Sequence, residues 1–223
     1  MEERFIRNVP AISEAEQACL ARKCAAVAGC GGLGGYLVEY LARLGVGKLI
    51  VIDGDSFERS NMNRQLLCTE RTLGCGKAEA AAQRIREIRP ETEVLCCAEN
   101  LTAENADRLL SGADLVLDAL DSAQARCVLA DACGRLSLPL IHGAIQGWNA
   151  QIAVCMPGDG SMQRLYGEAS PAPDKSCLSF TPALCAAMQT AEALRLLLGK
   201  ESALQSRLLL ADLRYMEFET LPL

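Results

Sequence analysis

A glycine-rich segment at residues 29–35 could bring the backbone close to a phosphate group. Gly29, Gly31 and Gly34 fit the pattern G-x-G-x-x-G between an apolar run and a helical pattern. Residues without a Cβ let a ligand approach the main chain, and the following helix offers unpaired N–H groups to negative charge. We therefore expect this loop, with Gly32, to bind a nucleotide rather than only to pack a strand against a helix.

An acidic residue, Asp53, ends the next apolar run at residues 48–53. A carboxylate at this place in a nucleotide-binding unit can accept hydrogen bonds from ribose hydroxyls. Together the loop and the acid predict a nucleotide site, but they do not distinguish a mononucleotide from a dinucleotide.

The elements that would position these residues alternate along the first 140 residues. Apolar runs at 24–28, 48–53, 94–97, 114–120 and 139–143 are separated by helical patterns ending near 45, 89, 110 and 136. This alternation is typical of an α/β fold with a doubly wound, mostly parallel sheet. A capping box at residues 13–16 predicts an N-terminal helix to residue 23.

The C-terminal part has a different pattern. A strand at 151–155 precedes a polar segment at 157–181, an apolar helix at 182–199 and a pair of strands at 207–211 and 215–220. We expect these strands to form an antiparallel extension of the sheet. The chain then forms one domain, 1–223, with an N-terminal helical segment at 1–23 and a crossover loop at 156–181.

Composition narrows the class of protein. The chain has 223 residues, 50% apolar and 22% charged, which suits one sizeable core. It has no apolar run long enough for a membrane span and no secretory signal pattern, and its net charge of −6 argues against a general nucleic-acid surface. Its twelve cysteines form no disulfide-like framework. We expect buried thiols, a reducing cytoplasm, and no membrane or nucleic-acid partner.

Six short motifs in a fixed order make the chain similar to the ThiF/MoeB/HesA family, relatives of the ubiquitin-activating enzymes. Each motif is weak alone, but the ordered set is specific and covers nearly the whole chain. The resemblance implies a Rossmann-like fold and ATP- and Mg²⁺-dependent adenylation of a carboxylate. The carboxylate would be the C-terminus of a small ubiquitin-like sulfur carrier with a Gly-Gly tail. The motifs are Arg4-Phe5-Ile6-Arg7-Asn8, the 29–35 loop, Asp53-x-Asp55, Ser60-Asn61-x-Asn63-Arg64-Gln65, Gly76-Lys77 and Asp118-x-x-Asp121.

The same resemblance implies roles for the charged residues. Arg64 and Lys77 would neutralise phosphate charge, and Arg7 would reach the site of the other subunit in a homodimer. Asp121 would be the magnesium ligand, since a hard cation prefers carboxylate oxygen. The nucleotide would lie close to Asp53, Asp55 and Asn61.

Two further side chains have uncertain chemistry. Cys177 is the only cysteine in the polar segment, but it lies closer to Pro182 than the family pattern places a working thiol. A loop thiol without chemistry is therefore favoured over a thioester or persulfide role. His142, the only histidine, is expected to be a hydrogen-bonded structural residue, with a substrate contact as the alternative.

Two other classes of protein remain open on the sequence. An NAD-dependent Rossmann oxidoreductase would explain the glycines and Asp53, but it leaves residues 60–65 and Lys77 without a purpose. A nucleotide-binding protein that adenylates a small molecule or tRNA, or that only serves as a scaffold for a partner, fits the same motifs.

The cysteine spacing predicts the metal content. Many members of the resembled family bind structural zinc through two Cys-x-x-Cys pairs, and this chain contains no such pair. Elemental analysis of the purified protein should therefore find no stoichiometric zinc. About one zinc per chain would contradict the prediction.

Overall fold

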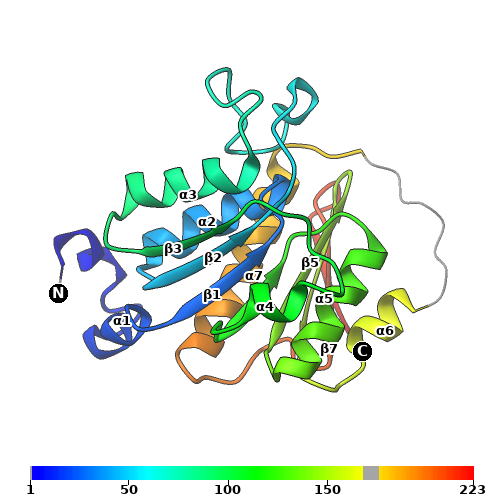
Figure 1. The fold of residues 1–223 in the computed structure, drawn as a ribbon. Helices are drawn as coiled ribbons and strands as arrows, with labels where there is room; N and C mark the ends of the chain where they lie inside the picture. Colours follow the sequence, from blue (N-terminus) through cyan, green and yellow to red (C-terminus); the bar gives the residue numbers. More distant parts are fainter. Residues whose placement is uncertain (1, 168–175) are drawn as a thin grey trace.

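The computed structural model describes residues 2–167 and 176–223, which form an α/β fold around one eight-stranded sheet (Figure 1). The strand order is β3-β2-β1-β4-β5-β6-β7-β8. The first five strands in this order pair in parallel, and β6, β7 and β8 add antiparallel neighbours. The strands are β1 (Cys24–Ala28), β2 (Lys48–Ile52), β3 (Glu93–Cys97), β4 (Leu115–Asp118), β5 (Leu140–Gln146), β6 (Asn149–Cys155), β7 (Arg207–Asp212) and β8 (Glu217–Pro222).

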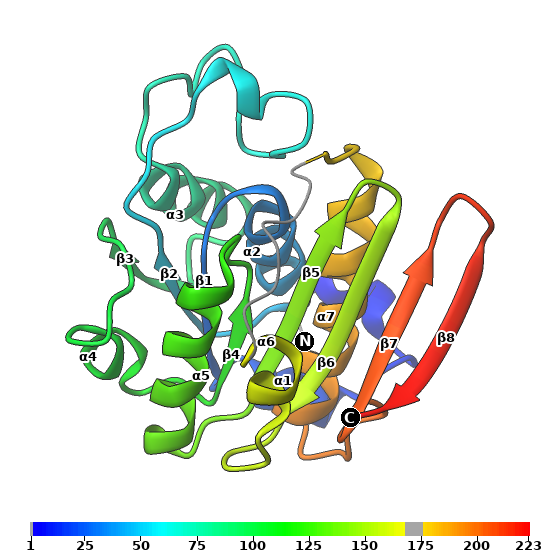
Figure 2. The same ribbon diagram turned by 90° about the vertical axis from the view of Figure 1, so that its right-hand side faces the viewer.

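Helices cover both faces of the sheet (Figures 1 and 2). One hydrophobic cluster joins the sheet to α2 (Gly32–Leu44), α3 (Lys77–Ile88) and α7 (Phe180–Leu197). A second joins the other face to α4 (Ala106–Leu110), α5 (Ala123–Leu136) and α6 (Ser161–Tyr166). The central strands β1 and β4 are buried along their whole length, which explains why they read as continuous apolar runs. The predicted doubly wound sheet with an antiparallel C-terminal extension is confirmed.

The N-terminal segment packs at the edge of the sheet where the parallel strands begin. It contains the 3₁₀ helix η1 (Glu3–Asn8) and α1 (Glu14–Leu20), whose predicted capping box is present. Phe5 lies against Gly45, the residue that ends α2, and a Cβ on Gly45 would be 2.6 Å from the phenyl ring. Because α2 starts at the glycine loop and has thirteen residues, about 20 Å separates that loop from the N-terminal segment.

Several predicted boundaries were wrong. Inside the polar segment 157–181 the structure contains α6, which is too short to give a readable periodicity. Strand β4 ends at Asp118 rather than at residue 120, because the Asp118 side chain accepts the N–H of Leu120 and turns the chain out of the sheet. Strand β5 continues to Gln146 and forms a hairpin with β6. Helix α7 begins at Phe180, inside the expected crossover loop, and residues 168–175 of that loop lie outside the described residues.

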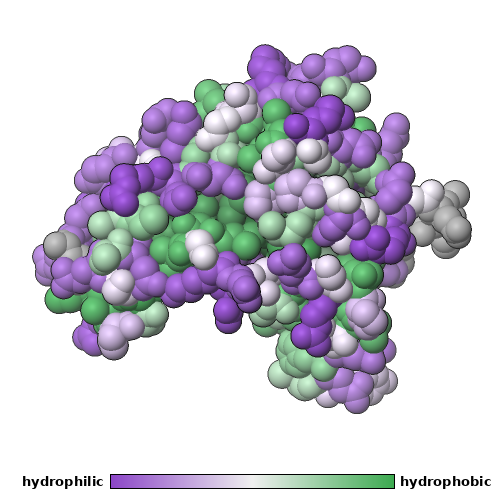
Figure 3. Space-filling view, turned by 90° about the horizontal axis from the view of Figure 1, so that it is seen from below, coloured by the Kyte–Doolittle hydropathy of each residue, from purple (hydrophilic) through white to green (hydrophobic). Residues whose placement is uncertain are grey.

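Figure 3 views the molecule from below, turned by 90° from the view of Figure 1. Hydrophobic side chains gather in a hollow beside the N-terminal segment, and hydrophilic side chains surround it. Within residues 2–167 and 176–223, no helix has the length and apolar character that a membrane crossing requires.

Candidate nucleotide site

Three segments that follow parallel strands meet at one edge of the sheet. The N–H of Gly29, after β1, donates to Ile52 O at the end of β2 (2.8 Å), and the N–H of Ala119, after β4, donates to Ala28 O (2.9 Å). Strand β1 lies between β2 and β4, where the strand order reverses. Ligands of open α/β sheets bind at such a switch point.

Packing requires only some of the glycines in the loop. A Cβ on Gly34 would lie 1.8 Å from Gly29 O, and one on Gly29 (φ +94°) would lie 2.6 Å from Ala119 O. At Gly31 and Gly32 a Cβ would meet nothing closer than 3.5 Å and 3.8 Å, respectively. Packing within this chain therefore accounts for Gly29 and Gly34, whereas a Cβ on Gly31 or Gly32 would make only ordinary van der Waals contacts, so packing does not require glycine at these two positions.

The start of α2 has the features of an anion site. Its N-cap, Gly31, supplies no side-chain acceptor, and its first turn contains no acidic residue. The first-turn N–H groups and the helix dipole therefore favour a negative ligand. Beside Gly31 lies Gln65, a buried residue whose Oε1 has no hydrogen-bond partner. The start of the helix fits a phosphate group, whereas the unpaired Gln65 oxygen is an acceptor and fits a hydroxyl or amino group of the ligand.

The Asp53 carboxylate joins the glycine loop to the end of β2. Its Oδ2 accepts the N–H of Cys30 (2.7 Å) and its Oδ1 accepts the N–H of Asp55 (2.9 Å). Burial raises the pKa of Asp53, while these two N–H groups and the charge of Lys77 oppose the rise. Each carboxylate oxygen has a second lone pair, so Asp53 can also accept a ribose hydroxyl.

The predicted cations lie on the loop that follows β2 and on the helix after it. Lys77, the first residue of α3, is largely buried, and its Nζ lies 2.9 Å from Asp55 Oδ2. Arg64 donates to Ser60 O (3.0 Å) and to Asn63 Oδ1 (2.8 Å). Both cations therefore have partners within this loop region, and no contact between Lys77 and Arg64 is found among the residues that the structure describes.

The amide side chain of Asn61 has a local role. Its Oδ1 accepts the N–H of Glu58 (3.0 Å) and caps the 3₁₀ helix η2 (Arg59–Asn61). Asn61 thus shapes the loop that carries Arg64, and its predicted contact with a nucleotide stays a prediction.

Asp121 is exposed on the loop between β4 and α5. This loop adjoins the glycine loop through the Gly29–Ala119 contact. Across the described ranges, no three His, Cys, Asp or Glu side chains cluster as a metal site. A single carboxylate still fits Mg²⁺, which usually keeps several waters and binds through one or two carboxylates plus substrate phosphates.

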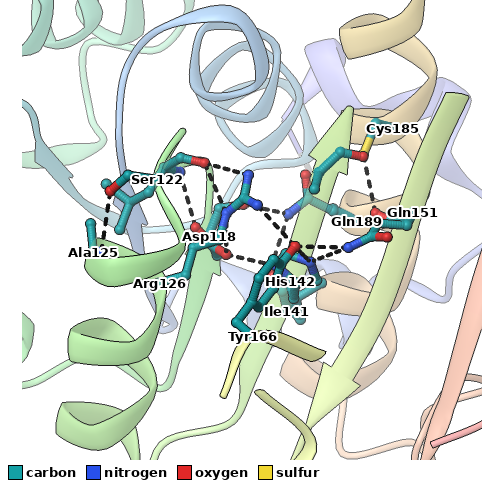
Figure 4. Close-up of polar contacts among 12 residues, drawn as sticks. Asp118, Ser122, Ala125, Arg126, Ile141, His142, Gln151, Tyr166, Cys185 and Gln189 are labelled. Atoms are coloured by element: carbon teal, nitrogen blue, oxygen red, sulfur yellow. Dashed lines mark hydrogen bonds and ion pairs between the residues drawn. The ribbon is translucent and has the colours of Figure 1, made fainter. Parts of the chain in front are cut away.

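A buried polar network beneath this loop was not predicted (Figure 4). His142 Nδ1 lies 2.7 Å from Asp118 Oδ2, and both side chains are fully buried. The hydroxyl of Tyr166 lies 3.0 Å from His142 Nε2 and accepts from Gln151 and Arg126, each at 2.8 Å. The structural interpretation of His142 is therefore confirmed. The available signal was a histidine and a glutamine inside apolar strands, because buried polar groups require partners.

Arg7 and Cys177 lie apart from the glycine loop. Arg7 is exposed in the N-terminal segment, at the opposite edge of the sheet. Cys177 is half-buried, and its carbonyl accepts from Asn63 Nδ2 at 3.1 Å. Burial raises the pKa of the Cys177 thiol, and nearby Arg64 opposes the rise. A raised pKa keeps the thiol protonated and lowers its reactivity.

A cavity of about 890 Å³ lies between the loop carrying Arg64, the β5–β6 turn and the β7–β8 turn. Its lining includes Arg64, Cys177, Trp148 and Arg214. The centres of the Trp148 and Phe180 rings lie 5.1 Å apart, and the Arg214 guanidinium lies 5.8 Å from the centre of the Trp148 ring.

Comparison with known proteins gives a family match over nearly the full length. The model of the ThiF family matches residues 3–223. The SAMP-activating enzyme E1 of Haloferax volcanii is 37% identical over 88% of this chain and 75% of its own length. Protein HesA of Leptolyngbya boryana is 33% identical over 97% of this chain and 80% of its own.

Two further similar proteins match this chain over only part of their length or at low sequence identity. The adenylyltransferase and sulfurtransferase MOCS3 of Drosophila yakuba is 36% identical over 83% of this chain, which spans only 43% of that relative. The crystal structure of E. coli MccB with ATP superposes with a TM-score of 0.83 at 20% identity, covering all of this chain and 72% of MccB. At that identity the structural likeness establishes the fold alone.

The arrangement predicts nucleotide preference. We expect calorimetry to detect binding of ATP with Mg²⁺ and no binding of NAD, because Lys77 and Arg64, the predicted phosphate-binding cations, follow strand β2 and the adjoining Asp53 along the chain. Lys77→Met should weaken ATP binding, whereas Lys200→Met, which removes a cation paired with Glu16 on the surface, should not. Tight NAD binding without ATP binding would contradict the prediction.

Proposed function

The chain belongs to the ThiF family of adenylyltransferases, and we propose that it adenylates a small ubiquitin-like sulfur-carrier protein in the cytoplasm. The ATP-dependent reaction would take place at the C-terminal carboxylate of a Gly-Gly tail. The observation that carries the proposal is one shared edge of the sheet. The free N-terminus of α2, Lys77 and the exposed carboxylate of Asp121 all adjoin this edge. The names of the SAMP-activating and MOCS3 relatives support the choice of substrate class.

Adenylation places demands that these residues can meet. A carboxylate oxygen of the carrier forms a bond to the α-phosphorus of ATP, the bond to the bridging oxygen breaks, and pyrophosphate leaves with that electron pair. The N–H groups at the start of α2 bind phosphate oxygens, and Lys77 and Arg64 offset their charge. Mg²⁺ held by Asp121 would supply further positive charge. Asp53 orients the ribose, so the protein acts mainly by positioning and charge stabilisation.

The position of Arg7 supports a homodimer. Its own glycine loop is about one α2 length away, so within one chain Arg7 cannot contact a phosphate bound there. In a two-fold dimer each N-terminal segment can reach the site of the other chain. The hydrophobic hollow beside this segment (Figure 3) is a surface that such an assembly would cover.

The carrier tail would use the cavity beside Arg64. This cavity is lined by the β5–β6 turn with Trp148 and by the backbone next to Cys177. The cavity volume of about 890 Å³ has room for an extended C-terminal tail. A thioester or persulfide at Cys177 would belong to a later transfer, after the carboxylate is activated.

Adenylation of a small molecule or of tRNA is the second candidate. It would use the same glycine loop and the same cations, and it differs only in what occupies the cavity. Pyrophosphate exchange that depends on an added carrier protein, and not on small carboxylic acids, distinguishes the two.

Removing the charge of Asp121 should stop the chemistry and spare the fold. Asp121→Asn is nearly isosteric and lies on an exposed loop. Loss of one electrostatic contact to the reacting phosphate costs on the order of 10²–10³ in rate. We therefore expect carrier-dependent ATP–pyrophosphate exchange to fall by that factor.

Two control variants accompany this measurement. Asp131→Asn removes an exposed carboxylate from α5 and should leave exchange unchanged. Cys177→Ala should also leave exchange intact, because a thiol acts only after activation. Exchange at the wild-type rate in Asp121→Asn would refute the magnesium assignment, and loss of exchange in Cys177→Ala would refute the proposed order of steps.

A subunit-mixing experiment tests Arg7. Arg7→Ala alone should impair adenylation. Mixing it with Asp121→Asn should restore activity to about a quarter of the wild-type rate, because half the dimers are mixed and each of these has one complete site. No recovery on mixing, or an active monomer in sedimentation, would exclude Arg7 from the partner's site.

A further inference from the structure

We propose that Tyr166 is a positioning residue for Asp121: its hydroxyl, acting through Arg126, holds the 119–122 loop beside the glycine loop. The role of Asp121 in this inference rests on the proposed function. Tyr166 itself does not need to touch a substrate in this role. Among the residues that the structure describes, its hydroxyl contacts Arg126, His142 and Gln151.

The hydroxyl of Tyr166 has a defined hydrogen-bonding role. It accepts from Arg126 Nη1 and from Gln151 Nε2, each at 2.8 Å. With its acceptor sites used, its proton points to His142 Nε2 at 3.0 Å. His142 then carries its proton on Nδ1 and donates it to Asp118 Oδ2 at 2.7 Å. Gln151 Nε2 also lies 3.2 Å from His142 Nε2, so the contact that only the residue-166 hydroxyl makes is the one that accepts from Arg126.

Arg126 connects this hydroxyl to the loop. Its Nε and Nη2 both donate to the carbonyl of Leu120, at 3.1 Å and 2.7 Å, while Nη1 donates to Tyr166 (Figure 4). The guanidinium also lies 5.2 Å from the centre of the Tyr166 ring. The phenol therefore contacts Arg126 through both its hydroxyl and its ring, which favours the orientation that reaches Leu120.

Leu120 is held at both of its backbone polar groups. Its carbonyl is held by Arg126, and its N–H donates to Asp118 Oδ1 at 2.9 Å. The next residue is Asp121, and Ser122 then caps α5 by accepting the N–H of Ala125. Asp121 is thus an exposed carboxylate between two fixed neighbours. Its main-chain position depends on groups buried beneath the loop.

The first test is hydrogen exchange in the free protein, without nucleotide or metal. In Tyr166→Phe the Arg126 guanidinium loses the hydroxyl that accepts its Nη1–H. Because Arg126 then holds the Leu120 carbonyl less firmly, the backbone amide of Leu120 should exchange about tenfold faster. Thr92→Val is the matched control. It removes a buried hydroxyl, 3.4 Å from Val46 O, at the opposite edge of the sheet. In that variant the Leu120 amide should exchange as in wild type.

The second test uses the reaction and a double variant. Tyr166→Phe should lower kcat for carrier-dependent pyrophosphate exchange by about tenfold. Combined with Asp121→Asn, it should add no further loss, because both act through one carboxylate. Arg126→Met should reproduce both effects, and Arg126→Lys, which keeps a donor near Leu120 O, should recover part of the rate.

The outcomes separate the inference from the proposed function. If the Leu120 amide exchanges faster in Tyr166→Phe while the wild-type protein has no adenylation activity, the positioning role is supported and the proposed function is overturned. An active wild type with unchanged Leu120 exchange and unchanged kcat in Tyr166→Phe would overturn the inference. Additive losses in the double variant would also overturn it, since Tyr166 would then act independently of Asp121.

Discussion

The close approach of three backbone segments at the end of β1 determines the rest of the site. Gly34 packs its Cα against Gly29 O, and Gly29 packs against Ala119 O, in contacts that leave no room for a Cβ. These contacts fix the direction in which α2 leaves the sheet, and they set the 119–122 loop beside the start of that helix. The N-terminus of α2, where we propose that phosphate binds, adjoins the loop that carries the exposed carboxylate of Asp121 because the backbones touch there.

Asp118 holds the start of the 119–122 loop from its buried side. Its carboxylate binds His142 and the N–H of Leu120, and its own carbonyl accepts from Gln189 of α7 at 2.9 Å. The Gln189 amide also donates to Ile141 O at 3.0 Å. A buried charge is tolerated only when its hydrogen-bonding capacity is used. The network therefore joins β4, β5 and α7 at the point where the loop begins, and partial loss of it would leave buried groups unpaired.

The sequence predicted the parallel half of the fold closely, because buried strands appear in a sequence as continuous apolar runs and amphipathic helices as a repeat of apolar residues. Cys24–Ala28 and Ala123–Leu136 match their predicted bounds. It missed α6, whose six residues bury only Ser161 and Met162. The structure brings the glycine loop, Asp53 and the 119–122 loop together as strand order demands. The contacts of Tyr166 and Arg126 could not be predicted, since they join residues 40 apart through side-chain geometry.

The balance of charge supports the proposal that a second subunit and Mg²⁺ complete the site. Two cations, Lys77 and Arg64, stand against three carboxylates, Asp53, Asp55 and Asp121, and Lys77 is already paired with Asp55. A triphosphate adds several more negative charges, and like charges at short range raise the energy of the bound state. In the proposed reaction this excess of negative charge would be offset by cations from outside the chain. The proposed Mg²⁺ and the proposed Arg7 of a second subunit are two sources that this sequence offers, and both would act where the helix N-terminus already favours an anion.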